Sequence, residues 1–312
     1  MISVLEFKEK LKSFYAKYGR YVDMAAKFVV TLVALLLINK SLGYMQKLDN
    51  PFLVIIVSLL CSLLPYGLIA VILGVCLIAQ VYAVSMEMAI LLAIILLVIA
   101  VLYYGFHPKD AHILILTPIL FAIKIPYAVP LIVGLSAGIT TIVPVSCGIL
   151  LYYMVAFIKN NAGLLTNDTS IEITSRYKQL LNGIITNKQM WLIIITFAVA
   201  ILIVFLIRQL SVNYSWYIAI AAGILVILLG IFTGQSVLDI ETSMADTIIQ
   251  IALSTLVALI YTFFAFNVDY TRTEITQFED DDYYYYVKAV PKVKVQTSGK
   301  KVRKFTEKKA SG

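Results

Sequence analysis

The stretch MWLIIITFAVAILIVFLIRQ, at residues 190–209, indicates the fold class of this chain. It has no charged side chain before Arg208, and it is as long as the roughly 20 helical residues that cross a hydrocarbon core of about 30 Å. Backbone groups inside that core must be hydrogen bonded within the chain, so we expect a transmembrane helix. Further long apolar stretches lie at 25–43, 66–85, 87–105, 140–158, 213–233 and 246–267.

The composition of the whole chain supports the same interpretation. Apolar residues make up 61% of its 312 residues and charged ones 14%, whereas a soluble domain has about 45–50% and 25%. We therefore predict an all-α fold, a polytopic helical membrane protein in contact with the lipid bilayer. A net charge of +7 could suggest nucleic acid, but Lys and Arg gather mainly near the two termini, a placement typical of membrane proteins that argues against a nucleic-acid partner.

Three shorter apolar runs, 51–64, 112–123 and 126–138, decide the number of membrane segments. If all three cross, the chain has ten segments, and if the first two are re-entrant it has eight. Both totals are even and basic residues flank both ends, so the positive-inside rule places the N- and C-termini in the cytoplasm, at the plasma membrane. Counting back the three spans that precede the tail places the polar loop 159–189 outside.

The predicted organisation has five regions. Residues 1–23 mix apolar side chains at helical spacing with Lys and Arg, which suits either a helix lying on an anionic inner leaflet or a basic flank that sets topology. Apolar residues between 177 and 185 recur at helical spacing and predict an interfacial helix. The regions are a basic amphipathic cytoplasmic segment at 1–23, an N-terminal membrane region at 24–158, an exterior loop at 159–189, a C-terminal membrane region at 190–267 and a cytoplasmic tail at 268–312.

Two Pro-Tyr pairs have similar surroundings. Residues 63–74, LLPYGLIAVILG, resemble residues 124–134, KIPYAVPLIVG, and each pair follows a short apolar run and precedes two further apolar segments. The stretches 51–105 and 112–158 are then either two copies of one three-segment unit, the second inverted relative to the first, or a chance similarity between apolar sequences.

Broken helices in an inverted repeat are typical of a transport pathway, because a helix break exposes backbone dipoles that can bind a substrate inside the membrane. Lys124, an ionisable residue beside the second pair, fits that interpretation. A proline in a membrane helix can also mark a simple kink, and a lysine can extend to the interface. The pathway candidates are Pro65, Tyr66, Lys124, Pro126 and Tyr127.

The sequence has no pattern that predicts catalysis. It lacks a Walker loop, HExxH and GxSxG, so we expect no catalytic residue and no enzyme activity. The three cysteines lie in apolar runs without metal-ligand spacing and are interpreted as small packing residues. The polar cluster at 107–112 contains two His and one Asp, which is not a complete ligand set, so we expect a solvated turn and neither metal nor cofactor.

The tail contains the most distinctive local sequence, FEDDDYYYYVKAVPKVKV at residues 278–295. Four tyrosines followed by alternating Val and Lys favour an extended strand, which Pro291 would place at a sheet edge. A single strand is not stable alone, so it invites β-addition to a cytosolic or membrane protein or to another copy of this chain. The other interpretation is a disordered, topology-setting tail. The partner-binding candidates are Phe278, Tyr283, Tyr284, Tyr285, Tyr286 and Val287.

The tail FEDDDYYYYVKAVPK, joined to this hydrophobic body, resembles that of polytopic membrane proteins of uncharacterised function from anaerobic Gram-positive bacteria. The many-span body with a Pro-Tyr-Gly break also looks like the membrane region of the stage II sporulation phosphatase, in layout alone. Neither resemblance implies functional residues.

Two hypotheses follow. The first is a non-enzymatic membrane scaffold or accessory subunit of the bacterial cell envelope, which docks a partner through its tail. The alternative is a secondary transporter or permease subunit with a pathway at the broken helices near Pro65 and Pro126.

Overall fold

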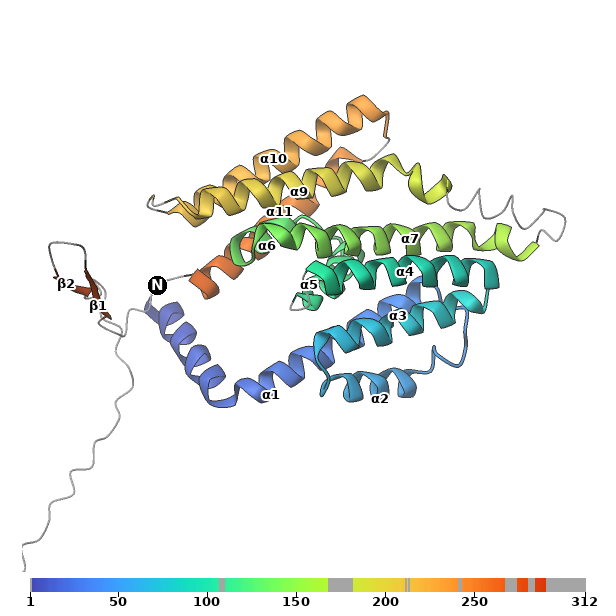
Figure 1. The fold of residues 1–312 in the computed structure, drawn as a ribbon, viewed down its shortest axis with the longest axis horizontal. Helices are drawn as coiled ribbons and strands as arrows, with labels where there is room; N and C mark the ends of the chain where they lie inside the picture. Colours follow the sequence, from blue (N-terminus) through green and yellow to red (C-terminus); the bar gives the residue numbers. More distant parts are fainter. Residues whose placement is uncertain are drawn as a thin grey trace, which may run out of the picture. The chain divides into compact units, whose positions relative to one another are not determined.

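The computed structural model describes residues 2–106, 110–167, 182–210, 212, 214–240, 243–266, 274–279 and 284–289. Helices account for most of them, which confirms the all-α fold class (Figure 1). The elements are α1 (Ile2–Ser41), α2 (Pro51–Cys61), α3 (Tyr66–Tyr82), α4 (Met86–Phe106), α5 (Ala111–Ala122), α6 (Ala128–Ser136), a 3-10 turn (Ile139–Thr141), α7 (Ile142–Asn167), α9 (Lys188–Arg208), α10 (Ser215–Leu238), α11 (Met244–Phe266), β1 (Glu274–Glu279) and β2 (Tyr284–Ala289).

Six of the described helices, α1, α4, α7, α9, α10 and α11, are long and apolar enough to cross a membrane. The chain is therefore a multi-pass membrane protein. The six include every long run that the sequence predicts except 66–85. That stretch forms α3, which ends at Tyr82 after 17 residues and is a shorter apolar helix.

The outer surfaces of these helices suit a hydrocarbon environment. On α4 the exposed positions Ile94, Leu97 and Val101 follow one another at helical spacing. On α11 the buried positions are mostly small, among them Ser254, Ala258 and Thr262, while larger aliphatic side chains are exposed. Contiguous apolar surface of this kind is unusual in water, and small residues on the inner face allow close helix packing in a bilayer.

The chain separates into two compact units. One comprises Met1–Gly19 with Phe263–Gly312, and the other comprises Arg20–Thr262. Helix α1 passes from the first to the second near Tyr18, whose backbone angles (φ −121°, ψ 18°) interrupt the helix. The second unit, called here the helical body, contains most of the long helices.

Contacts define two ends of the helical body. At the end called here the Lys40 end, Gln80 Nε2 donates to Asn39 Oδ1 at 2.9 Å, so α3 finishes beside the last turn of α1. Ile158 of α7 and Ile184, which precedes α9, belong to one buried cluster there. At the opposite end, called the Arg208 end, the Arg208 guanidinium donates to the Leu135 carbonyl, so α6 and α9 finish together.

The first two short helices form a hairpin that opens at the Lys40 end. The loop before α2 is held there because the Met45 N–H donates to Gln80 Oε1 at 2.8 Å. Helix α2 then leads away to a break at 62–65, and α3 starts at Tyr66, whose ring lies 5.5 Å from Lys27 Nζ. Helix α3 returns to the Lys40 end.

The second pair of short helices forms a hairpin that opens at the Arg208 end. Thr117 of α5 lies against Gly148 of α7, and Phe121 lies 5.0 Å from the Tyr152 ring, so α5 runs in the same direction as α7. Helix α6 runs with α9, because the Tyr127 ring faces Phe197 at 6.0 Å and α6 ends at Arg208. Since α7 and α9 are antiparallel, α6 returns to the end at which α5 began.

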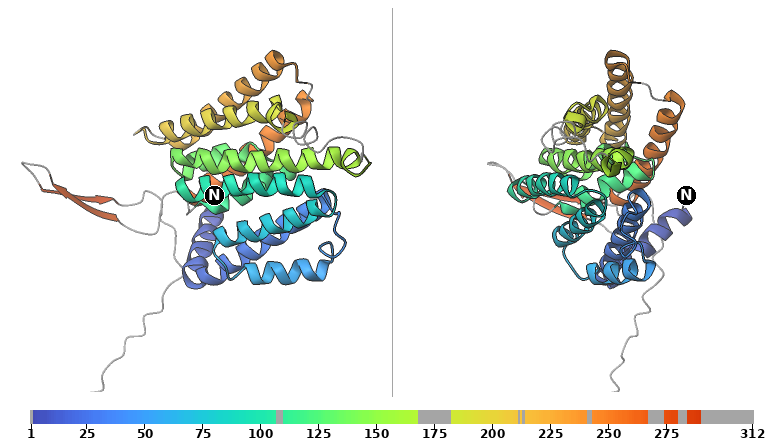
Figure 2. Two further views of the ribbon diagram at one scale, coloured as in Figure 1. Left: turned by 45° about the vertical axis from the view of Figure 1, so that its right-hand side comes forward. Right: turned by 90° about the vertical axis from the view of Figure 1, so that its right-hand side faces the viewer.

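The short runs 51–64 and 112–123 therefore each pair with the helix that follows them. Because both arms of a hairpin end on the same side, the number of crossings stays even whether or not a hairpin spans the bilayer. In Figures 1 and 2, α9 lies beside α10 and α4 lies beside α7.

The first part of the predicted exterior loop 159–189 is helical. Helix α7 has 26 residues and continues to Asn167. Residues 182–185 are helical, and the remainder of the predicted interfacial helix, at 177–181, lies outside the described residues. In the polar cluster at 107–112, residues 107–109 also lie outside them.

In the first unit, the tail forms a two-stranded antiparallel hairpin, which corrects the prediction of a single strand over 278–295. Strand β1 pairs with β2 so that Phe278 faces Tyr285 and Gln277 faces Tyr286. The sequence EITQFE in β1 also has β-branched and aromatic residues, whose β-propensity favours this second strand. Tyr283 and Pro291 lie outside the described residues.

The N-terminal part of α1 joins this unit through Lys8. Its Nζ donates to the Phe263 carbonyl at 3.1 Å and lies 5.5 Å from the Phe263 ring. The side chain is 6% exposed. A lysine near the final carbonyls of α11 satisfies one of the acceptors that a helix end leaves open. Phe7, Phe14 and Tyr15 remain exposed, as an interfacial helix requires.

Candidate functional site: an apolar cavity with a basic end

The first Pro-Tyr break lies at the Arg208 end of the helical body. Pro65 is exposed and occupies the N-cap position of α3. Two groups lie near the Tyr66 ring. Lys27 Nζ is 5.5 Å from the ring centroid, and the centroid of the His112 ring is 5.9 Å from it. The break is therefore close to a cation and to the first turn of α5.

The second break has a different backbone. Lys124 is exposed and has a left-handed conformation with φ 63°. Its N–H donates to the Phe121 carbonyl at 3.1 Å, and the Ile125 N–H donates to the Leu120 carbonyl at 2.9 Å. These two bonds form a Schellman motif, which ends a helix and usually has Gly at the left-handed position. Helix α5 therefore ends through a standard cap, even though Lys124 occupies the place of a glycine.

The residues after this cap are buried at the middle of the neighbouring helices. Tyr127 is 6% exposed, and its side chain lies near that of Thr247. Phe197, which contacts Tyr127, is central in α9, and Phe197 also lies 5.8 Å from Phe121. The tip of the second hairpin thus packs in an aromatic cluster inside the helical body.

The structure does not bring the two breaks together. Tyr66 contacts the first turn of α5, whereas Tyr127 follows its last turn. Helix α5 has 12 residues, which is about 18 Å of helix. The five pathway candidates therefore belong to two separate locations.

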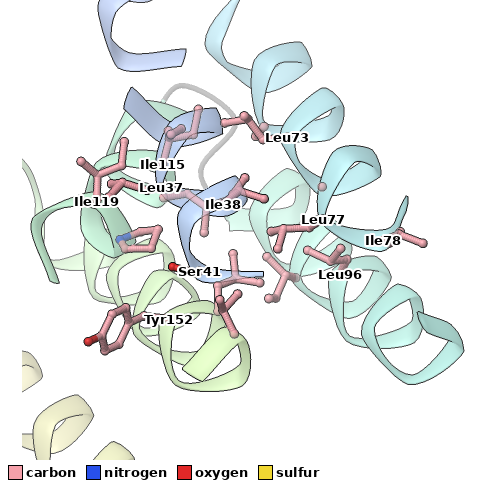
Figure 3. Close-up of a pocket in the computed structure, with 18 of the residues that line it drawn as sticks. Leu37, Ile38, Ser41, Leu73, Leu77, Ile78, Leu96, Ile115, Ile119 and Tyr152 are labelled. Carbon is pink, nitrogen blue, oxygen red and sulfur yellow. The ribbon is translucent and has the colours of Figure 1, made fainter. Parts of the chain in front are cut away.

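A cavity of about 730 Å³ lies between α1, α3, α4, α5 and α7. Its walls are aliphatic, with Ile38 of α1, Leu77 of α3, Leu96 of α4 and Ile119 of α5 around it and Tyr152 of α7 at one side (Figure 3). Both predicted repeat units contribute walls. Small lining residues widen the space, namely Ala34, Gly67, Ala70, Gly74, Ala93, Ala100, Ala122 and Ala156.

The charged side chains of the lining are at the Lys40 end. Lys40 and Ser41 end α1, and Lys159 and Asn160 lie in the last part of α7. None of the described residues that line the cavity is acidic. The cavity therefore combines a long apolar wall with a basic end.

A buried polar network fixes the end of α1 on which Lys40 lies. Gln80 is completely buried, and its amide bonds both to Asn39 and to the Met45 backbone. Asn39 Nδ2 donates to the Leu48 carbonyl at 2.8 Å. Because every polar group of Gln80 has a partner, this network is stabilising and holds the loop 42–50 against α3.

Sequence reasoning missed this cavity and the network beside it. The lining residues come from five helices, and each of them is an ordinary aliphatic or small residue in its own segment. Lys40 and Lys159 each follow an apolar run, where a lysine is expected at the interface in any case. The only sequence signal available was the pair of cations at equivalent ends of two long runs.

Other predicted chemistry can be compared with the described residues. Among them, no three His, Cys, Asp or Glu side chains are close enough to hold a metal ion. Cys61, Cys76 and Cys147 are free thiols, and Cys61 and Cys147 are buried.

The tail candidates lie on both strands of the β hairpin. Phe278 is in β1, and Tyr284, Tyr285, Tyr286 and Val287 are in β2. Tyr284 and Tyr286 alternate with Tyr285 and so share a face, and they are 70% and 71% exposed. Two large aromatic rings therefore stand on one accessible face of β2.

Comparison with protein-family models, with curated proteins and with solved structures finds no match to this chain, so its function has to be argued from its own residues.

Proposed function

We propose that this protein is a non-enzymatic integral membrane scaffold or accessory subunit of the bacterial cell envelope, and that it docks a cytosolic or membrane partner through the β1–β2 hairpin. The observation that carries the proposal is the exposed pair Tyr284 and Tyr286 on β2. Exposed tyrosines are enriched where proteins bind one another, because the ring supplies a large contact area with little loss of conformational entropy.

The backbone of the hairpin supports the same role. Among the described residues, the sheet has two strands, so each strand has one edge without a described neighbour. An isolated two-stranded hairpin is only marginally stable in water, and a third strand added to its edge would stabilise it. The correction from one strand to two therefore changes the proposed docking element from a lone strand to a preformed edge.

The proposed topology places this hairpin in the cytoplasm. Each short-helix hairpin returns to the side on which it began, so the total number of crossings is even. Basic residues flank both termini, and the positive-inside rule then assigns both to the cytoplasm. The Lys40 end of the helical body accordingly faces the outside.

A cross-linking experiment tests the docking proposal. The full chain, a Tyr284→Ser/Tyr286→Ser variant and a matched Tyr214→Ser variant are purified from native membranes after cross-linking, and the recovered proteins are compared by mass spectrometry. Tyr214 is an equally exposed tyrosine before α10, outside the tail. We expect a partner that is recovered with the full chain and with Tyr214→Ser but lost with the double variant. Identical recoveries from all three would contradict the proposal.

A second candidate function is a secondary transporter or permease subunit, and the arrangement of the two hairpins favours it. One hairpin opens at the Lys40 end and the other at the Arg208 end, and each is followed by a long helix, α4 or α7. Inverted units with broken helices are the arrangement on which many transporters are built. Lys124→Ala and Pro126→Ala should then alter the uptake or export of a solute, and unchanged flux across a broad panel would count against transport.

A further inference from the structure

We propose that the cavity between α1, α3, α4, α5 and α7 binds one anionic phospholipid, with its phosphate at Lys40 and Lys159 and an acyl chain along the aliphatic walls. This goes beyond the docking function and does not depend on it. Neither the tail hairpin nor a protein partner is needed for the lipid to bind.

The cavity wall matches a hydrocarbon chain. The volume of about 730 Å³ is bounded mainly by Leu, Ile, Val and Ala side chains. Val75 and Leu97, which line it, are 59% and 64% exposed. The cavity is therefore accessible from the flank of the helical body, which in a membrane is occupied by lipid. An apolar space of this kind excludes water and favours an aliphatic occupant.

The charge at its end selects the headgroup. Lys40 and Lys159 line the cavity together with the hydrogen-bonding side chains of Ser41 and Asn160, and none of the described lining residues is acidic. Within the described residues, neither lysine has an assigned hydrogen bond, ion pair or ring contact. Two cations and two neutral polar groups on the lining of one cavity complement a phosphate, whose oxygens accept charge-assisted hydrogen bonds.

The depth of the two lysines in the membrane also suits the binding of a phospholipid headgroup. Lys40 lies near the end of the apolar run 25–43, and Lys159 directly follows the run 140–158. Both side chains therefore lie where hydrocarbon gives way to headgroups, so a lipid of that leaflet can place its phosphate and its chain in the cavity at the same time. The network of Asn39 and Gln80 holds the α1 turn that carries Lys40, which reduces the ordering needed on binding.

The test is lipid retention by the full-length protein. Protein in nanodiscs that contain equal amounts of phosphatidylglycerol and phosphatidylcholine is transferred to mild detergent, and the lipids that remain bound are measured by native mass spectrometry. The variants are Lys40→Gln/Lys159→Gln, Ala156→Phe, which fills the cavity one turn before Asn160, and two controls. The controls are Lys47→Gln, an exposed loop lysine, and Val199→Phe, on the exposed face of α9.

We expect one phosphatidylglycerol to remain on the unaltered protein in preference to phosphatidylcholine. Retention should fall about tenfold or more in the double lysine variant, because each lysine beside an anionic headgroup contributes a several-fold factor. It should fall similarly in Ala156→Phe and stay unchanged in both controls. Equal retention of the two lipids by the unaltered protein would overturn the charge assignment, and full retention by Ala156→Phe would overturn the cavity assignment.

Inorganic phosphate distinguishes a lipid site from a simple anion site. If millimolar inorganic phosphate displaces the bound lipid, the lysines bind any phosphate and the acyl chain adds nothing, which contradicts the proposal. We expect the lipid to resist displacement. Size-exclusion elution of each variant at the position of the unaltered protein shows that a loss of lipid does not come from misfolding.

Discussion

The two Pro-Tyr breaks begin from similar sequence and differ in almost every structural respect. At the first, Pro65 is exposed and Tyr66 is half-buried near a cation at one end of the helical body. At the second, Pro126 and Tyr127 are buried against the middle of α9, and Lys124 has a left-handed backbone. The same dipeptide thus interrupts a helix in both places, while its neighbours decide its depth and its contacts.

This difference also affects the transport hypothesis. A pathway through both breaks would need them to face one another, and α5 separates them along its length. The second break places a buried tyrosine, Tyr127, near Thr247, and a site within the membrane would use polar side chains of this kind. The same kind of substitution made at each break should therefore change the stability of the protein by different amounts.

The largest expected difference is between the two tyrosines. Tyr127→Ala should lower the free energy of unfolding by about 3–5 kcal/mol, because it removes a buried ring from an aromatic cluster and leaves a cavity. Tyr66→Ala should cost less, about 1–2 kcal/mol, since its ring is only half-buried. Unfolding in mixed micelles with increasing denaturing detergent measures both, and equal losses would contradict the assigned burial.

A second difference concerns one glycine in each predicted repeat unit. A Cβ at Gly148 would lie 2.6 Å from Thr117 Cβ, whereas a Cβ at Gly74 would meet Leu96 Cδ1 at 3.6 Å, an ordinary contact. Gly148→Ala should therefore destabilise the protein by about 1–3 kcal/mol through the α5–α7 contact. Gly74→Ala should leave stability unchanged or raise it by about 0.5–1 kcal/mol, because it removes a helical glycine. Both variants are compared in the same unfolding assay. The opposite ranking would show that α5 and α7 are not in close contact.

Glycine substitutions at the two breaks should have opposite signs. Lys124→Gly should stabilise the protein by about 1 kcal/mol, because a left-handed conformation is costly for a residue with a Cβ. Ser62, which follows α2, is right-handed with φ −60°, so Ser62→Gly should destabilise by about 0.5–1 kcal/mol. Thermal unfolding in detergent shows whether each variant is more or less stable than the unaltered protein. A loss of stability in Lys124→Gly would contradict the Schellman cap.

The smallest effect is the coupling between Lys27 and Tyr66. A double-mutant cycle with Lys27→Gln and Tyr66→Leu should give an interaction energy of about 0.5–1 kcal/mol, as expected for a cation–π pair at the edge of a membrane. The same cycle with Lys27→Gln and Tyr127→Leu should give none, because those residues lie at different ends of α5. A similar coupling in both cycles would mean that the two breaks are close together.

Much of the architecture follows from the sequence because it depends on local composition. Runs of about 20 apolar residues predict membrane helices, and α9 begins and ends within two residues of the predicted stretch 190–209. The two breaks at Pro65 and Pro126 are also local, since proline cannot continue the preceding hydrogen-bond pattern. The β character of residues 284–289 follows from their tyrosines and valine.

Only the tertiary structure decided how these pieces combine. The pairing of short helices into two hairpins that open at opposite ends, the burial of Tyr127, the internal partner of β2 and the cavity with Lys40 and Lys159 all depend on contacts between distant segments. A helix that is apolar on every side does not reveal which face meets a neighbour and which meets lipid. That choice depends on how side chains from several helices fit together, and such a fit leaves no periodic signal in any one of them.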